Sequence, residues 1–134
     1  MSGLRWLCQW MVLAVGVGLI GGCSNPSSPG VEPEITNATD NFQYQVTDIR
    51  GYTHESTYSW QNTGASANVN QAATITHGSA MLILVDGDGA IVYSRSLADN
   101  GTFVSAAGVP GLWTIRVNYS DASGTVNFRV QRKT

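Results

Sequence analysis

The sequence predicts an all-β protein, with an antiparallel β-sandwich of about seven to eight short strands in residues 41–134. Three observations support this fold class. Apolar residues alternate with polar ones in segment after segment, turn-forming residues recur about every ten positions, and no segment beyond residue 40 has a helical period. We therefore expect one domain, whose stability comes from core packing.

The first strands are expected in NFQYQV, TYSWQN and SANVNQAATIT, at residues 41–46, 57–62 and 66–76. Alternation at period two places one face of each strand against the core and the other face in water. The apolar residues that share one side of these strands are Phe42, Tyr44, Val46, Tyr58, Trp60, Ala67, Val69, Ala73 and Ile75.

The next two strands are expected to form a hairpin. AMLILV, at 80–85, is continuously apolar, which is typical of a strand that is buried on both faces. DGDG, at 86–89, then separates it from AIVYSRSL, in which Ile91, Tyr93 and Leu97 share one side. A glycine-rich turn between two such runs is a strong hairpin signal.

The closing segments predict a second hairpin. After TFVSA and the turn GVPG, the chain reads LWTIRVNY at 112–119 and GTVNFRV at 124–130, joined by SDASG. Both segments alternate at period two, so each is expected to bury one face. The residues expected at the centre of the core are Trp60, Leu82, Leu84, Trp113 and Phe128.

Residues 1–22 have the three parts of a secretory signal peptide. MSGLR carries a positive charge, and WLCQWMVLAVGVGLIGG has no charge and ends in small residues. This uncharged run has 17 residues, at the short limit of the ~17–25 that a spanning helix needs. Its glycines also weaken it as a helix. A cleaved signal is the interpretation that we prefer, and an uncleaved anchor helix is the alternative.

The end of the signal, IGGC at residues 20–23, resembles the bacterial lipobox, in which an aliphatic and two small residues precede a cysteine. The resemblance implies cleavage between Gly22 and Cys23, a diacylglyceryl group on Cys23 and acylation of the new amino terminus. Apart from this covalent lipid, no cofactor is expected. Because Cys8 lies in the signal, the mature chain would have no free thiol for a disulfide, a nucleophile or a metal.

Residues 23–40 are predicted to be the lipidated amino terminus and a flexible linker. Their prolines and polar residues cannot bury enough apolar surface to fold. The formal charge of the chain is −2, from 7 basic and 9 acidic residues, which argues against nucleic acid as a partner. Ser24 follows the cysteine where aspartate would favour the inner membrane. By resemblance to Gram-negative lipoproteins, the expected location is the periplasmic face of the outer membrane.

The second half of the domain is similar to small bacterial β-sandwich modules of the prepeptidase C-terminal kind. The shared pattern is a buried strand that ends in Asp-x-x-Gly, then Gly-x-Trp-x-Ile-x-Val, and then Gly-x-Val-x-Phe-x-Val. It falls on Leu82, Ile83, Asp86, Gly89, Gly111, Trp113, Ile115, Val117, Gly124, Val126, Phe128 and Val130. The resemblance implies a sandwich fold and a non-catalytic role, although such modules are usually appended to enzymes.

Asp86 and Asp88 are the candidate metal ligands. Calcium binds several oxygen atoms, and a close aspartate pair in a turn can supply two or three of them. The complete calcium-loop pattern is missing, because residues 90–92 carry no ligand side chains. Aspartate and glycine are also the residues that a tight turn requires. A plain turn is preferred and no metal site is predicted, but whether calcium binds near Asp86 stays open.

The sequence contains no recognisable catalytic constellation. His54 and Glu55 are adjacent, so on a strand they point to opposite faces, and His77 is distant in the chain. No nucleophile elbow, zinc-protease motif or phosphate-binding loop is present. The protein is therefore not expected to be an enzyme.

Tyr52 and Tyr58 are the candidate binding residues. A row of aromatic rings on one face of a sandwich stacks on sugars or packs on a protein partner. The same rings also fill cores, and Tyr58 shares its side of the strand with Trp60. For Tyr52, the sequence does not decide between a core position and a binding role.

Together these features predict a lipid-anchored cell-envelope lipoprotein with a non-catalytic binding or structural module. The expected partners are the membrane, through the lipid, and an envelope protein or polysaccharide. One alternative is a carbohydrate-binding or calcium-dependent adhesion module, and a second is a small envelope enzyme or enzyme inhibitor. The second would require a cleft with converging polar groups.

Overall fold

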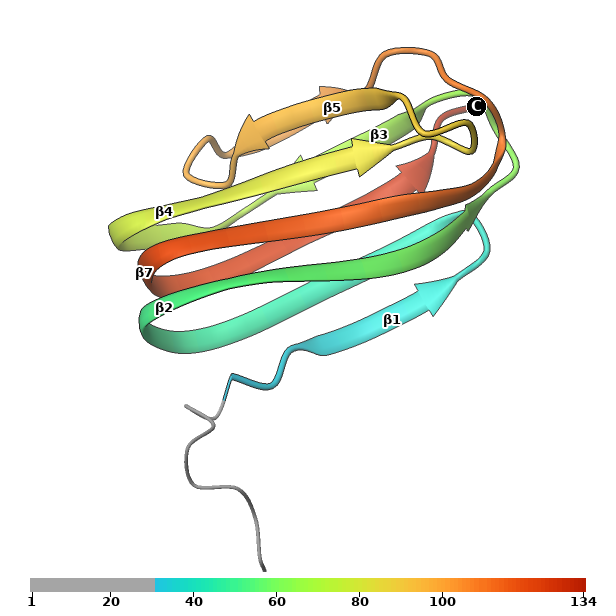
Figure 1. Ribbon diagram of the computed structural model, residues 1–134. Coiled ribbons are helices and arrows are strands. Elements are labelled where there is room, and N and C mark those ends of the chain that lie inside the picture. The colour runs from blue at the N-terminus through green and yellow to red at the C-terminus, as the bar shows by residue number, and fades with distance from the viewer. Residues whose placement is uncertain (1–30) are drawn as a thin grey trace, which may run out of the picture. The chain divides into compact units, whose positions relative to one another are not determined.

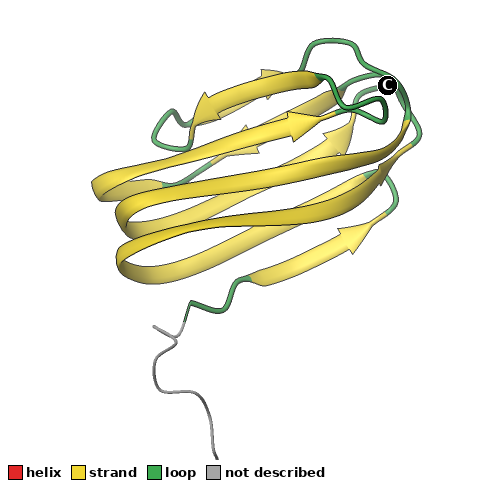
Figure 2. Ribbon diagram, viewed as in Figure 1, coloured by secondary structure: helices red, strands yellow, loops and turns green. Residues whose placement is uncertain are grey.

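The computed structural model describes residues 31–134. This region is all-β and antiparallel, as predicted, and Figure 2 shows strands and loops throughout it. The seven strands are β1 (Glu34–Ala38), β2 (Asn41–Asn62), β3 (Ala67–Gln71), β4 (Thr74–Val85), β5 (Ile91–Ser96), β6 (Gly101–Val104) and β7 (Gly111–Arg132).

The strands belong to one hydrogen-bonded sheet that folds over on itself into two layers (Figure 1). The first half of β2 pairs with the second half of β7, and the second half of β2 pairs with the first half of β7. In layer 1 the order is β1, β2, β7, β3 and β6. In layer 2, β2 and β7 continue beside β4, which pairs in turn with β5.

The long strands bend where the sheet folds. Register shifts interrupt the β2–β7 ladder between Val46 and His54, and the β4–β7 ladder between Ile75 and Ser79. Such β-bulges bend a strand and increase its twist. The residues with positive φ at this folded edge are Asp48, Gly51, Gly78, Asp121 and Gly124.

The folded edge is also a close approach of backbones. A Cβ on Gly78 would lie 2.0 Å from the carbonyl oxygen of Asp121, and a Cβ on Gly124 would lie 2.0 Å from that of Thr74. Only glycine fits at either position without moving the backbone. Gly124 is therefore required by the bend within β7.

The predicted second hairpin is wrong. Residues 112–119 and 124–130 belong to one bent strand, β7, and do not pair with each other. SDASG is the corner of that strand, where Asp121 and Gly124 have positive φ. The first predicted hairpin is confirmed, because β4 pairs with β5 across the DGDG turn.

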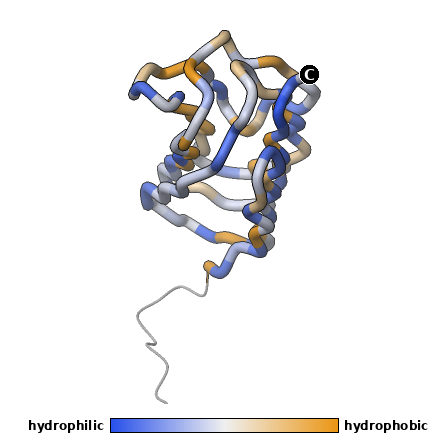
Figure 3. The backbone as a smooth tube through the Cα atoms, turned by 90° about the vertical axis from the view of Figure 1, so that its right-hand side faces the viewer, coloured by the Kyte–Doolittle hydropathy of each residue, from blue (hydrophilic) through white to orange (hydrophobic). Residues whose placement is uncertain are grey.

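The core lies between the two layers, and all five residues expected at its centre are buried. Trp60 and Trp113 pack edge to face with ring centroids 6.0 Å apart, and Phe128 stacks on Tyr44 at 4.9 Å. Figure 3 shows the hydropathy colours alternating along the chain. This alternation leaves the inner sides of the strands apolar.

Polar side chains also connect the layers through the core. The hydroxyl groups of Tyr44, in layer 1, and Tyr119, in layer 2, share a buried hydrogen bond. The side-chain amide of Gln71 donates to the carbonyls of Ser96 (3.0 Å) and Asp99 (2.6 Å), and its oxygen accepts from the Tyr93 hydroxyl (2.7 Å). Every polar atom of the Gln71 side chain is thus bonded.

Two strands differ from their expected burial. Leu82 and Leu84 are buried, but Ile83 and Val85 are only half-buried, because one side of β4 faces outward from layer 2. Ile91 is 63% exposed, since a register shift at the start of the β4–β5 ladder breaks the expected alternation.

The sheet begins earlier in the chain than the sequence suggested. β1 lies within residues 23–40, which the sequence predicts to be the lipidated terminus and a flexible linker. All five of its residues are exposed, so it lacks the alternating burial that would mark a strand. β1 is an edge strand, held by pairing with β2.

Candidate functional site: an amide-lined groove

The outer surface of layer 1 is covered by amide side chains. The inward positions of its strands hold buried residues such as Phe42, Val69 and Phe128. Because side chains alternate between faces, the residues between them point outward. These outward residues are Asn41, Gln43, Gln45, Asn68, Asn70, Asn127, Arg129 and Gln131, which we call the amide face.

Strand register arranges the amide face in rows. Gln43 on β2 and Asn70 on β3 lie on either side of Arg129 on β7, and Asn70 is also opposite Thr102 on β6. Neighbouring strands are ~4.8 Å apart, so their side chains can contact one ligand together. A second row consists of Asn41, Gln131 and Asn68.

Part of this face is hollowed into an open groove of about 380 Å³. Its lining residues are Asn68, Asn70, Thr102, Asn127, Arg129 and Gln131. Among the described residues, no carboxylate and no aromatic ring lines it. The groove therefore offers neutral hydrogen-bonding groups around one cation.

Most of these polar groups are available to a ligand. Asn70 Nδ2 donates to Thr102 Oγ1 at 2.9 Å, which is the only hydrogen bond between groove side chains within residues 31–134. A side-chain amide has two N–H donors and an oxygen that accepts. The groove thus carries many unused donors and acceptors in a small area.

Arg129 differs from the other arginines of the described region. It is exposed and forms no ion pair with any residue from 31 to 134. The other arginines of this region each lie beside a carboxylate, in the pairs Arg50–Asp48, Arg95–Asp99, Arg116–Glu55 and Arg132–Asp40.

Asp86 caps the β4–β5 turn. Its Oδ1 accepts from the backbone N–H groups of Asp88 (2.9 Å) and Ala90 (2.8 Å), and its Oδ2 accepts from that of Val109 (2.8 Å). These hydrogen bonds, first that from Val109, lower the pKa of Asp86. The carboxylate is buried and ties the turn to the loop before β7.

The sequence-predicted metal pair is not arranged around one point. Both carboxylate oxygens of Asp86 accept backbone hydrogen bonds, and Asp88 is exposed on the turn. Within residues 31–134, no group of three or more histidine, cysteine, aspartate or glutamate side chains could hold a metal ion. The geometry of Asp86 is that of a turn cap.

The two candidate tyrosines are packed against the core and do not form an exposed strip. Tyr58 lies 5.6 Å from Phe42 and 6.0 Å from Tyr44, measured between ring centroids, so it fills space between the layers. Tyr52 packs edge to face on Tyr119 at 5.0 Å. Both tyrosines remain partly exposed.

The histidines do not converge with a carboxylate and a third polar group. His77 Nε2 lies 3.0 Å from Asp121 Oδ2 in an exposed pair at the folded edge. Glu55 pairs with Arg116 at 3.0 Å, and the ring of His54 lies 5.6 Å from that of Tyr52. These pairs are separate surface contacts.

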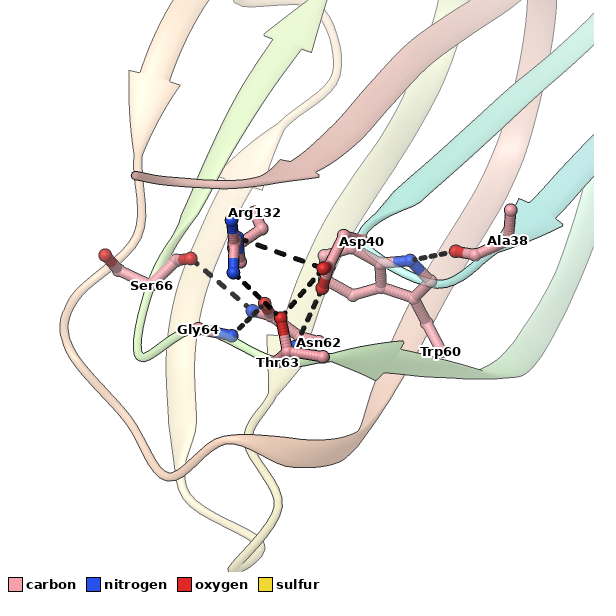
Figure 4. Close-up of polar contacts among 8 residues, drawn as sticks. All are labelled: Ala38, Asp40, Trp60, Asn62, Thr63, Gly64, Ser66 and Arg132. Carbon is pink, nitrogen blue, oxygen red and sulfur yellow. Dashed lines mark hydrogen bonds and ion pairs between the residues drawn. The ribbon is translucent and has the colours of Figure 1, made fainter.

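A polar network closes the opposite end of the sandwich (Figure 4). Asp40 accepts from the backbone N–H of Thr63 at 2.7 Å and from its hydroxyl at 2.8 Å, and Arg132 donates to that hydroxyl at 3.0 Å. The contacts with Thr63 and Arg132 lower the pKa of Asp40. Trp60 Nε1 donates to the Ala38 carbonyl at 3.0 Å. The network connects β1, β2 and the end of β7.

The amide face was not among the sequence-predicted sites. Its signal is the set of polar positions in NFQYQV, SANVNQ and NFRVQR, which hold asparagine and glutamine where charged side chains are common. Only the pairing of β2, β7 and β3 brings the three segments side by side.

The predicted signal peptide 1–22, the cleavage site at Gly22 and the lipidation site at Cys23 lie outside the described residues. Within residues 31–134, no helix is long and apolar enough to cross a membrane.

No family model matches this chain, and no curated protein matches it significantly. Among solved structures, it aligns with a chain of the "Structure of infectious bursal disease virus Gt strain" at 18% sequence identity and a TM-score of 0.32. The alignment covers 89% of this chain and 34% of the viral one, so this chain spans about a third of that protein's length. A TM-score this low supports no inference about function.

Proposed function

We propose that the protein is a lipid-anchored cell-envelope lipoprotein whose β-sandwich is a non-catalytic binding module. The observation that carries the binding role is the groove on the amide face. Its amides are neutral and do not titrate, so they are suited to hold a ligand and unsuited to general acid–base or nucleophilic chemistry. Binding is therefore the activity that this site supports best.

The lipobox-like residues 20–23 support the anchoring part of the proposal. Acyl chains add ~0.8 kcal/mol of membrane affinity per buried methylene, so the several chains of a lipidated Cys23 would attach the protein stably. Residues after Cys23 would space the sandwich from the bilayer. With Ser24 after the cysteine, the periplasmic face of the outer membrane is the proposed location.

Mass spectrometry of the native protein tests the anchor. The expected result is a chain that begins at an acylated Cys23 and stays with the membrane fraction. Cys23→Ala should leave the protein unacylated and retain the signal peptide. An intact, unmodified segment from Met1 to Gly22 in the native protein would refute the lipoprotein assignment.

Crosslinking in native envelopes, followed by capture of the protein, tests the binding role. Intact protein is compared with Cys23→Ala and with Arg129→Gln. A partner that is captured with intact protein and lost with Arg129→Gln supports binding through the groove. Absence of any protein or glycan above the level of an uncrosslinked control would sink the binding role.

The calcium-dependent and enzymatic alternatives have less support from the described residues. The Asp86 carboxylate accepts three backbone hydrogen bonds, and these account for the geometry of the turn without a bound ion. A calorimetric titration with calcium checks this directly. Heat of binding together with a raised melting temperature would reopen the calcium-dependent adhesion module.

A further inference from the structure

We propose that the groove binds a carboxylate-bearing polysaccharide, with Arg129 as the residue that pairs with the carboxylate. This inference rests on the proposed binding function and names its ligand class. Three features of the groove support it: its amide lining, its unpaired arginine and the absence of acidic side chains among its lining residues.

The amide lining matches the hydroxyl groups of a sugar chain. A hydroxyl both donates and accepts a hydrogen bond, and so does a side-chain amide. Asn68, Asn127 and Gln131 make no side-chain hydrogen bond with residues 31–134, so their donors and acceptors are open to a ligand. Neutral amides also hold hydroxyls without the strong desolvation cost of charged groups.

The single cation of the groove selects for an anionic ligand. Arg129 lies between Gln43 and Asn70, and its planar guanidinium can pair with a carboxylate through two parallel hydrogen bonds. No acidic residue among the groove's lining side chains competes for it. A ligand with a carboxylate beside several hydroxyls would satisfy Arg129 and the amides together.

The charge distribution argues against nucleic acid in the same groove. Phosphate chains are bound by several cations in a row, whereas the groove has one arginine among its lining residues. Its lining also lacks an aromatic ring on which bases could stack. A protein partner remains a possible outcome of the test and is not the ligand proposed.

The test uses the full chain in mild detergent and a panel of carboxylated polysaccharides: polygalacturonate, alginate, hyaluronate and purified peptidoglycan strands. Each is compared with its own carboxyl-reduced form, which keeps the backbone and hydroxyls but is neutral at those positions. Affinity is measured by calorimetry, and the side-chain amide resonances of the groove are followed by NMR. At least one carboxylated polymer is expected to bind and to shift these resonances.

Two substitutions make the test specific. Arg129→Gln keeps a polar side chain and should weaken binding of the carboxylated polymer at least tenfold. The same substitution should change the affinity for the carboxyl-reduced polymer very little. Arg50→Gln is the matched control, because it removes the same charge from an exposed arginine whose partner is Asp48. It should change affinity less than twofold. Unchanged melting temperatures show that both variants are folded.

The outcomes separate this inference from the proposed function. Equal binding of reduced and carboxylated forms, equal binding by Arg129→Gln and intact protein, or no binding by any polymer of the panel would each overturn it. If envelope crosslinking then captures a protein partner, the binding function stands and only the glycan assignment fails. If crosslinking also captures nothing, both fail.

Discussion

Gly124, at the bend of β7, provides a stringent test of the folded sheet. Its φ is +130°, and an added Cβ would lie 2.0 Å from the Thr74 carbonyl oxygen. Gly111 is a matched control, because it has a φ of +133° and no heavy atom within 4 Å of an added Cβ. Comparison of the two alanine variants therefore separates the steric contact from the cost of the backbone conformation.

The expected magnitudes follow from these two terms. Alanine at either glycine strains the backbone, which lowers the free energy of unfolding by about 1–3 kcal/mol. Only Gly124→Ala also forces two backbone segments apart, and overpacking of this kind costs about 1–3 kcal/mol more. Gly124→Ala should therefore be less stable than Gly111→Ala by about 2 kcal/mol. For a domain of this size that is a difference of about 8–16 °C in melting temperature.

Urea unfolding of the full chain, followed by tryptophan fluorescence, measures both free energies of unfolding. Trp60 and Trp113 are buried between the layers, so their emission reports the loss of the core. Stability losses that agree to within about 0.5 kcal/mol would refute the close approach of β7 to the start of β4. A greater loss for Gly111→Ala would refute it more strongly.

Three further predictions concern polar groups. Burial raises the pKa of Tyr119 to about 12 and also raises that of Tyr44. The stability that these two buried hydroxyl groups contribute should therefore be fully present below the unfolded tyrosine pKa of about 10. It should fall as pH rises toward 12, with the phenolate absorbance of Tyr44 and Tyr119 appearing only as the protein unfolds. Titration of these two tyrosines in the folded state would contradict this. Gln71→Leu leaves the Tyr93 hydroxyl and the Asp99 carbonyl without their Gln71 partner, whereas the Ser96 carbonyl keeps its hydrogen bond from the Asp99 N–H, and it should cost about 1–3 kcal/mol of stability. In a double-mutant cycle, Tyr93→Phe should destabilise the Gln71→Leu variant less than it destabilises the intact protein. The lowered pKa of Asp86 means that its stabilising effect is present above the ordinary carboxyl pKa and lost as pH falls through the folded value; acid melts of Asp86→Asn should show a weaker dependence on pH, and identical slopes would exclude this role.

The strand content could be predicted because period-two alternation is a local property of the chain. The apolar positions of TYSWQN and LWTIRVNY correctly identify Trp60 and Trp113 as core residues. β1 could not be found in this way, because its residues are all exposed and its position depends on pairing with β2.

Strand pairing was the part that local pattern could not decide. The segments 112–119 and 124–130 are separated by SDASG, whose residues suit either a tight turn or the corner of a bent strand. The choice was made by distant contacts with β2 and β4, which support both halves of β7. Burial of the core between two layers outweighs a local hairpin.

The sequence alone determined that the chain is all-β, which side of each strand is apolar, and that IGGC resembles a lipobox. Only the tertiary structure decided that Gln43, Arg129 and Asn70 lie in one row, because they come from strands far apart in the chain. Alternation sets the face on which a side chain lies, but the order of strands sets its neighbours. A binding surface is made of neighbours, so the groove exists only once β7, β3 and β6 have paired.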